Sequence, residues 1–119
     1  SLLPADGRYE VGIARAERQC YTGAVLGGER FFPAWLMPED DPWVGLALEA
    51  LRGIGQEPEL GVYRFCTNGS FSAGTAGIPT IGYGPSYEHL AHIVDEYIEL
   101  DQLERAAEGY LAIARRIAG

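Results

Sequence analysis

The sequence has few positively charged side chains, and they do not cluster. Nine of its 119 residues are Lys or Arg and 17 are Asp or Glu, so the formal net charge is -8. Arg115 and Arg116 form the one adjacent basic pair. Because nucleic acids and anionic membrane surfaces are bound through basic stripes, this composition argues against both as partners. Cations and neutral molecules are easier to accommodate.

Long apolar runs are also missing. Glu, Arg or Gly interrupts each run well before the roughly 20 residues that a bilayer crossing needs. The N-terminus has no basic region followed by an apolar run, so it does not look like a secretory signal. The length suits one globular domain with a sizeable core. We therefore expect a soluble, cytoplasmic protein that does not contact a membrane.

Cysteine is scarce, which excludes a disulfide-rich scaffold. The spacing of Cys20 and Cys66 matches no paired zinc-knuckle motif, and free thiols are the favoured interpretation. Cys66 precedes a glycine-containing turn, so it could line a site. A small buried apolar residue is the simpler alternative.

The N-terminal part of the chain is rich in β-forming residues. Residues 8–16 alternate apolar and polar side chains, which predicts a half-buried strand. We expect a turn at residues 17–19 and a second strand at residues 20–26. The aromatic segment at residues 31–36 contains Pro33, so it can be an edge strand or an extended packing segment.

Two helices are predicted from capping signals and apolar spacing. Asp41 as N-cap and Pro42 at the first helical position open one helix, which Gly53 and Gly55 should end. The other begins with Asp101 as N-cap, and Glu104 completes a capping box. Its apolar stripe consists of Leu103, Ala107, Tyr110, Leu111, Ala114 and Ile117.

Short apolar segments at residues 60–65 and 80–83 are typical of buried strands. The order of elements predicts an α/β fold with a short mixed sheet flanked by helices. Right-handed crossovers would make these two strands neighbours, so their ends would open onto one edge of the sheet. That edge would carry the turn at residues 67–70 and the loop at residues 84–96, and open α/β sheets bind ligands at such an edge.

The residues best suited to chemistry lie in this region. Both histidines, His89 and His92, are followed by Asp95 and Glu96. A structural histidine is commoner than a metal ligand, but zinc takes neutral imidazole whose second nitrogen a carboxylate can hold. The turn at residues 67–70 could offer N–H groups to an anion, or it could simply be a tight turn.

Several motifs in order resemble one enzyme family. The Thr-Asn-Gly motif at 67–69, the segment Ala-Gly-Ile-Pro-Thr-Ile-Gly-Tyr-Gly-Pro at 76–85, and Ala91-His92 followed by Asp95-Glu96 carry the resemblance. They are similar to the C-terminal end of the aminoacylase, carboxypeptidase G and acetylornithine deacetylase family of two-zinc metallopeptidases. Upstream, the Phe-Pro-Ala-Trp motif at 32–35 resembles a subgroup of proposed deacylases, some of them linked to selenium metabolism.

The resemblance implies roles for particular residues. His92 matches the family's last metal ligand, whereas His89 matches none. Asp95 and Glu96 would support the ligand without binding the metal themselves. The turn formed by Thr67, Asn68, Gly69 and Ser70 would bind substrate. The arginine that usually follows in this turn is absent, which argues against a simple amino-acid carboxylate as substrate.

The resemblance also implies a division of the chain. Residues 1–38 would be the end of a lid, or dimerisation, domain and the return segment, and residues 39–119 the C-terminal part of the catalytic domain. The family hydrolyses amide bonds with two zinc ions, for which cobalt or manganese can substitute, and with a glutamate base. Its His-x-Asp and Glu-Glu motifs do not occur here. We therefore expect no catalytic residue in this piece, and no activity from it alone.

Two interpretations remain open. The chain could be a piece of a zinc-dependent amide hydrolase, peptidase or N-deacylase, that acts on a small amino-acid-like or peptide substrate. Alternatively, it could be a non-catalytic binding or assembly module. In either case Val62, Phe65, Ile81 and the Phe31-Phe32 pair would expose apolar surface. We expect a homo-oligomer, or a complex with a complementing N-terminal half.

Overall fold

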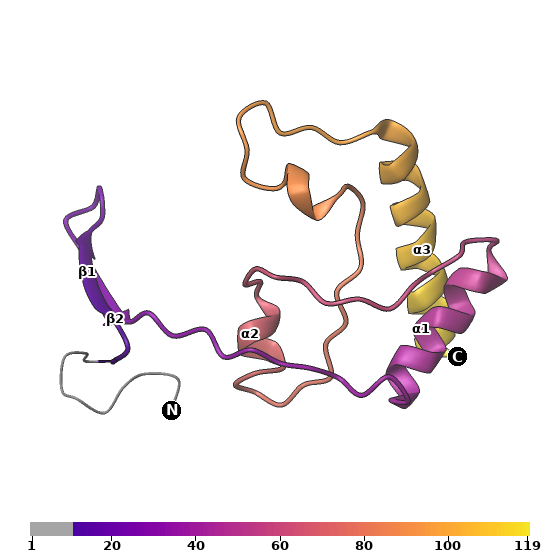
Figure 1. The fold of residues 1–119 in the computed structure, drawn as a ribbon, viewed down its shortest axis with the longest axis horizontal. Coiled ribbons are helices and arrows are strands. Elements are labelled where there is room, and N and C mark those ends of the chain that lie inside the picture. The colour runs from indigo at the N-terminus through magenta and orange to yellow at the C-terminus, as the bar shows by residue number, and fades with distance from the viewer. Residues whose placement is uncertain (1–10) are drawn as a thin grey trace. The chain divides into compact units, whose positions relative to one another are not determined.

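A computed structural model describes residues 11–119, which divide into two compact units between Phe32 and Pro33. The first contains the strands β1 (Arg15–Gln19) and β2 (Val25–Glu29). The second contains the helices α1 (Pro42–Gly53), α2 (Gly69–Ser72) and α3 (Leu100–Ala118), and the short 3-10 helix η1 (Glu88–Leu90) (Figure 1). The predicted α/β class, a short sheet with helices, is confirmed. The domain division after residue 38 stays a prediction.

The sheet is an antiparallel hairpin. Arg15 pairs with Glu29 at one end and Gln19 with Val25 at the other. The connecting turn is closed by the Gly23 N–H, which donates to the Cys20 carbonyl at 2.9 Å, and Gly23 has a φ of 85°. Glycine adopts this left-handed conformation without strain, so the position of Gly23 decides where the chain reverses.

The predicted strand bounds in this unit were wrong. Residues 17–19, predicted to be a turn, lie in β1, and the turn comes after Gln19. The second strand starts at Val25 instead of Cys20. Residues 8–10 of the first predicted strand lie outside the described residues, and residues 11–14 are not in a strand.

Helix α1 begins and ends as predicted. The Asp41 carboxylate accepts a hydrogen bond from the Trp43 N–H at 2.9 Å, and Pro42 occupies the first turn. After Gly53 the chain leaves the helix, and Gly55 adopts a φ of 79°.

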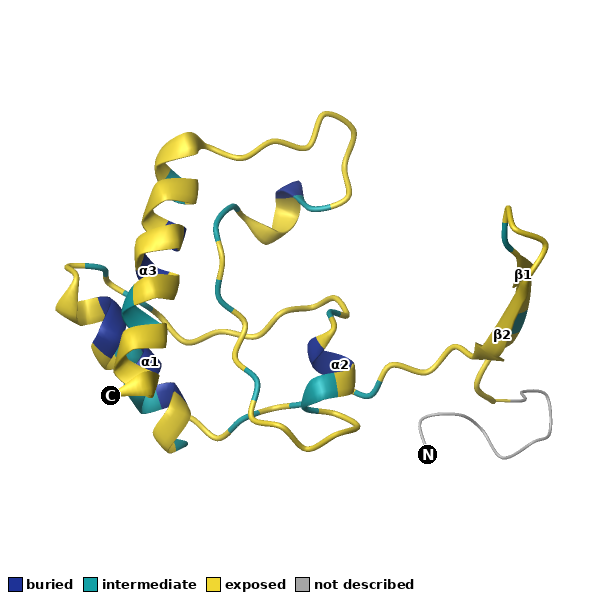
Figure 2. Ribbon diagram, turned by 180° about the vertical axis from the view of Figure 1, so that it is seen from behind, coloured by how far each residue is buried: buried dark blue, intermediate teal, exposed yellow. Residues whose placement is uncertain are grey.

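Helices α1 and α3 pack side by side and form the core of the second unit (Figures 1 and 2). Most of the buried side chains at their contact are small. The buried residues of the two helices are Val44, Ala47, Ala50 and Leu51 from α1, and Ala106 and Gly109 from α3. Small side chains let the two helices approach closely, which is how so few buried atoms can hold them together.

The predicted α3 helix is present, but its predicted cap and buried face were wrong. The residue before the helix is Glu99, which makes no side-chain cap, and Asp101 already lies in the first turn. The predicted stripe is largely exposed: Leu103, Tyr110, Leu111 and Ile117 each keep about half of their surface. The buried residues of α3 are the small Ala106 and Gly109, and Gly109 lies against the Tyr83 ring, so size rather than hydrophobicity distinguishes the buried face of the helix.

Neither residues 60–65 nor residues 80–83 form a strand, and the chain bends at Arg64 and Phe65. A strand needs a neighbour to bond its backbone, and here side chains take that role instead. The Thr80 carbonyl accepts from the Trp35 indole, the Tyr83 carbonyl accepts from the Tyr110 hydroxyl, and the Arg64 N–H donates to Glu88. The prediction of two neighbouring strands at these positions was therefore wrong for the described structure.

No helix in residues 11–119 combines the length and the apolar character needed to cross a membrane.

The close packing of α3 generates a first prediction. A Cβ at Gly109 would overlap the Tyr83 hydroxyl and ring, whereas a Cβ at Gly45 of α1 would meet nothing within 4 Å. Gly109→Ala should therefore lower the free energy of unfolding by about 1–3 kcal/mol. Gly45→Ala should leave it unchanged or raise it by roughly 0.5–1 kcal/mol. Urea unfolding followed by circular dichroism measures both, and equal effects of the two substitutions would contradict this packing.

Candidate functional site

The turn at residues 67–70 is tightly bonded to itself. The Gly69 N–H donates to the Thr67 hydroxyl at 3.1 Å, and the Ser70 N–H donates to the Thr67 carbonyl at 3.0 Å. Gly69 and Ser70 are buried, Thr67 is half-buried and Asn68 is exposed. Of the four predicted substrate-binding residues, Asn68 thus presents the most accessible side chain.

Trp35 covers this turn. A Cβ at Gly69 would overlap the six-membered ring of Trp35, so only glycine fits below the indole. The Trp35 Nε1–H donates to the Thr80 carbonyl at 3.1 Å, and the Thr80 and Ser72 hydroxyls lie 2.8 Å apart. No local sequence pattern places Trp35 near the turn. The one indication in the sequence was that the aromatic residues 31–36 could form an extended packing segment.

His92 lies in an exposed loop that follows η1. Leu90, at the end of η1, is buried and anchors the start of this loop. His92 itself has a φ of 64° and Asp95 a φ of 60°, both in the left-handed region that residues other than glycine seldom adopt. The His92 N–H donates to the Glu96 Oε2 at 2.9 Å.

The two histidines have different surroundings. The His89 ring stacks on Tyr87, with ring centres 5.6 Å apart, whereas the His92 ring meets the Phe65 ring edge-on at 6.4 Å. Within the described residues no group of three His, Cys, Asp or Glu side chains could hold a metal ion together. The described residues therefore fit a metal site only as contributors of some of its ligands.

Segments 60–65 and 84–96 meet, although they form no sheet. The Arg64 N–H donates to the Glu88 Oε1 at 2.9 Å, and Phe65 contacts the His92 ring. Thr67 follows Phe65 by two residues, so the turn and the histidine loop are held near each other through this short segment. The predicted meeting of these parts is present without the predicted strands.

Tyr63 extends the aromatic contacts at the same place. Its ring stacks on Phe65 with ring centres 5.3 Å apart, and Gly82 lies so close that a Cβ there would overlap the Tyr63 ring. Partial burial, with smaller contributions from Tyr110 and Glu88, raises the pKa of Tyr63 above its ordinary value.

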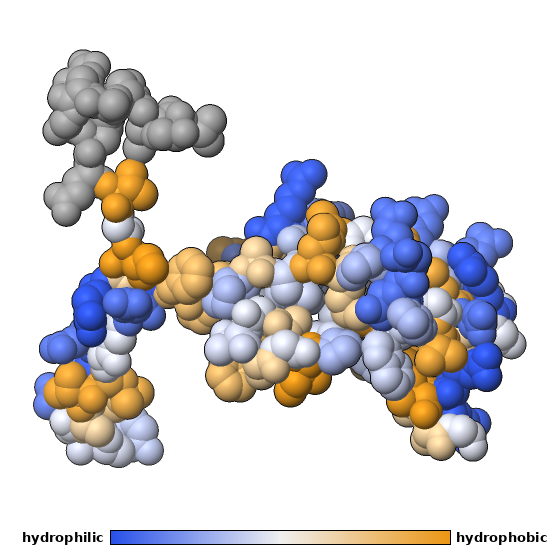
Figure 3. All heavy atoms as spheres, turned by 90° about the horizontal axis from the view of Figure 1, so that it is seen from below, coloured by the Kyte–Doolittle hydropathy of each residue, from blue (hydrophilic) through white to orange (hydrophobic). Residues whose placement is uncertain are grey.

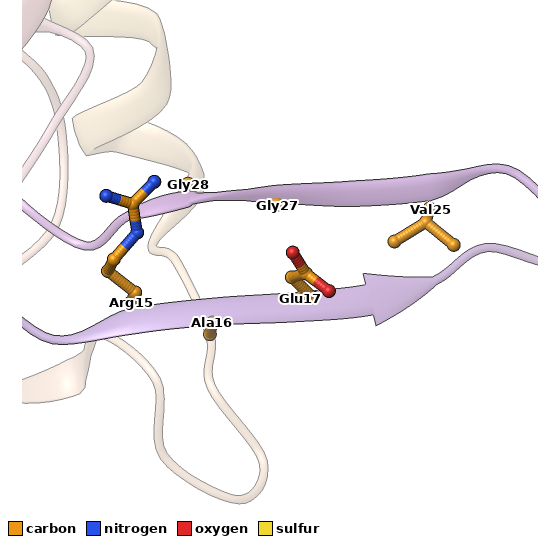
Figure 4. Close-up of a pocket in the computed structure, with 6 residues that line it drawn as sticks. All are labelled: Arg15, Ala16, Glu17, Val25, Gly27 and Gly28. Atoms are coloured by element: carbon orange, nitrogen blue, oxygen red, sulfur yellow. The ribbon is translucent and has the colours of Figure 1, made fainter.

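The hairpin of the first unit also has a hollow on one face. Figure 4 shows its lining, which consists of Arg15, Ala16, Glu17, Val25, Gly27 and Gly28. Arg15 forms an exposed ion pair with Glu29 at 3.4 Å, and the Glu17 side chain lies against Gly27. None of the predicted site residues lines it, and it offers little beyond an exposed strand surface.

The sequence profile of peptidase family M20/M25/M40 matches residues 10–116. The chain belongs to this family. It is 36% identical over 104 residues to the uncharacterized protein YgeY of Escherichia coli K12, and equally similar to YgeY of Escherichia coli O157:H7. The alignment covers 87% of this chain and 26% of each relative, so the chain spans about a quarter of their length. No solved structure matches the chain significantly.

The matched model covers both the turn at residues 67–70 and the loop that carries His92. This confirms the resemblance at the level of the family. The deacylase subgroup, the two-zinc site and the roles of His92, Asp95, Glu96 and residues 67–70 stay predictions.

The raised pKa of Tyr63 generates a second prediction. A tyrosine whose pKa is higher in the folded than in the unfolded chain binds its proton more tightly when folded, so its contribution to stability is lost as pH rises through the folded pKa. The free energy of unfolding should therefore fall as pH is raised above about 10. Urea unfolding between pH 9 and 11 measures this. Tyr63→Phe should flatten the dependence, whereas Tyr21→Phe, a change in an exposed tyrosine, should not.

Proposed function

We propose that this chain is the C-terminal part of a metal-dependent amide hydrolase, a peptidase or N-deacylase. Its substrate would be a small amino-acid-like or peptide molecule. The observation that carries this proposal is the family match over residues 10–116, which includes both the turn at residues 67–70 and the loop of His92.

In this proposal His92 contributes one metal ligand. Its side chain is exposed and belongs to no group of three possible ligands within the described residues, which suits a site completed by other parts of a longer protein. Imidazole is a ligand for zinc, and also for cobalt or manganese. Two zinc ions, when bound, would polarise the amide carbonyl and activate a water molecule.

The turn at residues 67–70 would form part of the substrate pocket. The exposed Asn68 amide has an NH₂ group that can donate to a substrate carbonyl and a carbonyl that can accept from a substrate N–H, so it can pair with a peptide or acyl-amide group. No arginine follows in this turn to pair with a free carboxylate. A peptide or N-acyl substrate is therefore favoured over a free amino acid.

The isolated chain should be inactive because one ligand does not hold a catalytic metal. The remaining ligands and the general base would come from the rest of a protein about four times as long, in line with the share of the relatives that this chain spans. The cytoplasm stays our predicted location, and the two unpaired cysteines, Cys20 and Cys66, are compatible with its reducing conditions.

One observation favours the second candidate function, a binding or assembly module. Large apolar side chains are exposed on α3 and beside it, among them Leu100, Leu103, Leu111 and Ile117, and apolar patches are visible in Figure 3. Such surface is usually covered by another part of a protein. We propose that a second copy of the chain, or the complementing N-terminal half, covers it.

The role of His92 is tested in the longer protein that carries these residues. His92→Ala should remove a ligand and lower kcat by at least about a thousandfold, whereas His89→Ala, with its ring stacked on Tyr87, should change kcat by less than about threefold. Steady-state hydrolysis of N-acyl amino acids and dipeptides, with metal content measured in parallel, compares them. A larger loss for His89→Ala would shift the ligand assignment by three residues.

The assembly prediction is tested on the 119-residue chain. We expect a dimer or larger assembly at tens of micromolar, because the exposed α3 stripe remains uncovered within the chain. Leu111→Gln, within the stripe, should lower the assembled fraction, and Glu108→Gln, outside the predicted stripe, should not. Light scattering coupled to size exclusion measures the mass. A monomer with sharp cooperative unfolding would contradict the proposal.

A further inference from the structure

The loop that carries His92 has very little internal bonding. Among the described residues, a single hydrogen bond involves residues 92–98, and it runs from the His92 N–H to Glu96 Oε2. No helix or strand covers these residues either, and every side chain from His92 to Ile98 is exposed. The conformation of this loop therefore depends on few interactions.

The same loop holds an unfavourable backbone geometry. His92 and Asp95 both have positive φ values, which the Cβ of an L-residue disfavours. Such conformations persist only where surrounding contacts fix them. The hydrogen bond from the His92 N–H to the Glu96 side chain links two residues that are four apart in the sequence. The segment it closes contains both His92 and Asp95.

We propose that Glu96 is a positioning residue that holds the backbone of His92 by accepting its amide proton, rather than by orienting its imidazole. This hydrogen bond needs an acceptor oxygen at the place of Glu96 Oε2, which a neutral carbonyl can also supply, and it stabilises the loop across both left-handed residues. This inference rests on the proposed role of His92 as a metal ligand.

The other end of the loop is fixed independently. Leu90 is buried, and Glu88 accepts the Arg64 N–H at 2.9 Å, so η1 is tied to the segment that leads into the turn at residues 67–70. The contacts of η1 hold the backbone before His92, and the hydrogen bond to Glu96 holds it after His92. Together they determine the direction in which the His92 side chain leaves the backbone. Without the Glu96 bond, only the backbone up to Ala91 is held.

The first test measures the backbone directly, in the metal-free form of the longer protein. Hydrogen exchange read by mass spectrometry over residues 91–99 should be about fivefold faster at the His92 amide in Glu96→Ala, because one hydrogen bond is lost. Glu96→Gln keeps a carbonyl acceptor and should stay near the unsubstituted rate. Glu104→Ala removes the same charge from an exposed position of α3 and should change nothing.

The second test measures zinc affinity by competition with a chelator, using the same variants and His92→Ala as reference. Glu96→Ala should weaken binding about tenfold, as loss of a supporting interaction typically does, and Glu96→Gln should restore most of it. If His92→Ala leaves affinity unchanged, the proposed ligand role is wrong. If His92→Ala weakens binding but Glu96→Ala does not, the positioning role alone is overturned.

The glutamine variant separates the two ways in which Glu96 could act. A carboxylate that held the imidazole through its charge would not be replaced by a neutral amide, so Glu96→Gln would then be as damaging as Glu96→Ala. That result would overturn the backbone role. Retained protection of the His92 amide together with retained affinity in Glu96→Gln supports it.

Discussion

The close contact between α1 and α3 is the interaction on which the second unit depends. Most of the buried residues of the pair are small, among them Ala47 and Ala50 of α1 and Ala106 of α3, and small residues leave room for helices to pack closely. Because Gly109 has no side chain, the Tyr83 ring can lie directly against α3. The helix pair thereby offers a surface on which the preceding loops can rest.

Polar contacts join those loops to the helix pair. The Tyr83 hydroxyl donates to the Gln56 side chain at 2.9 Å, Gln56 donates to the Arg105 carbonyl at 2.8 Å, and the Ser86 N–H donates to Gln102 at 2.6 Å. The candidate site is thus held by side-chain contacts from helices on one side and by Trp35 on the other.

Much of this structure could be predicted from local signals. The α1 cap was readable from Asp41 and Pro42, and the existence of α3 from its periodicity, because these features depend on neighbouring residues. The family resemblance was readable from the ordered motifs around His92. In contrast, the strands at residues 60–65 and 80–83 require partners that this chain does not provide, and apolar composition alone cannot reveal that.

The misjudged face of α3 has a related cause. Hydrophobicity favoured Leu103 and Leu111, but the buried residues of α3 are Ala106 and Gly109. A glycine adds nothing to an apolar pattern, so the pattern could not reveal the position that lies against the Tyr83 ring. The role of Trp35 was hidden for another reason. It contacts a turn more than 30 residues away, and no local pattern records such a pairing.

The contact between Trp35 and Gly69 has a consequence for how this region can vary. The indole fills the space that any side chain at position 69 would need. The side chains at positions 35 and 69, which are far apart in the sequence, therefore compete for the same space. An alanine at position 69 would be tolerated only beside a smaller residue at position 35. Where homologous chains differ at either position, the change at one should accompany an opposite change in size at the other.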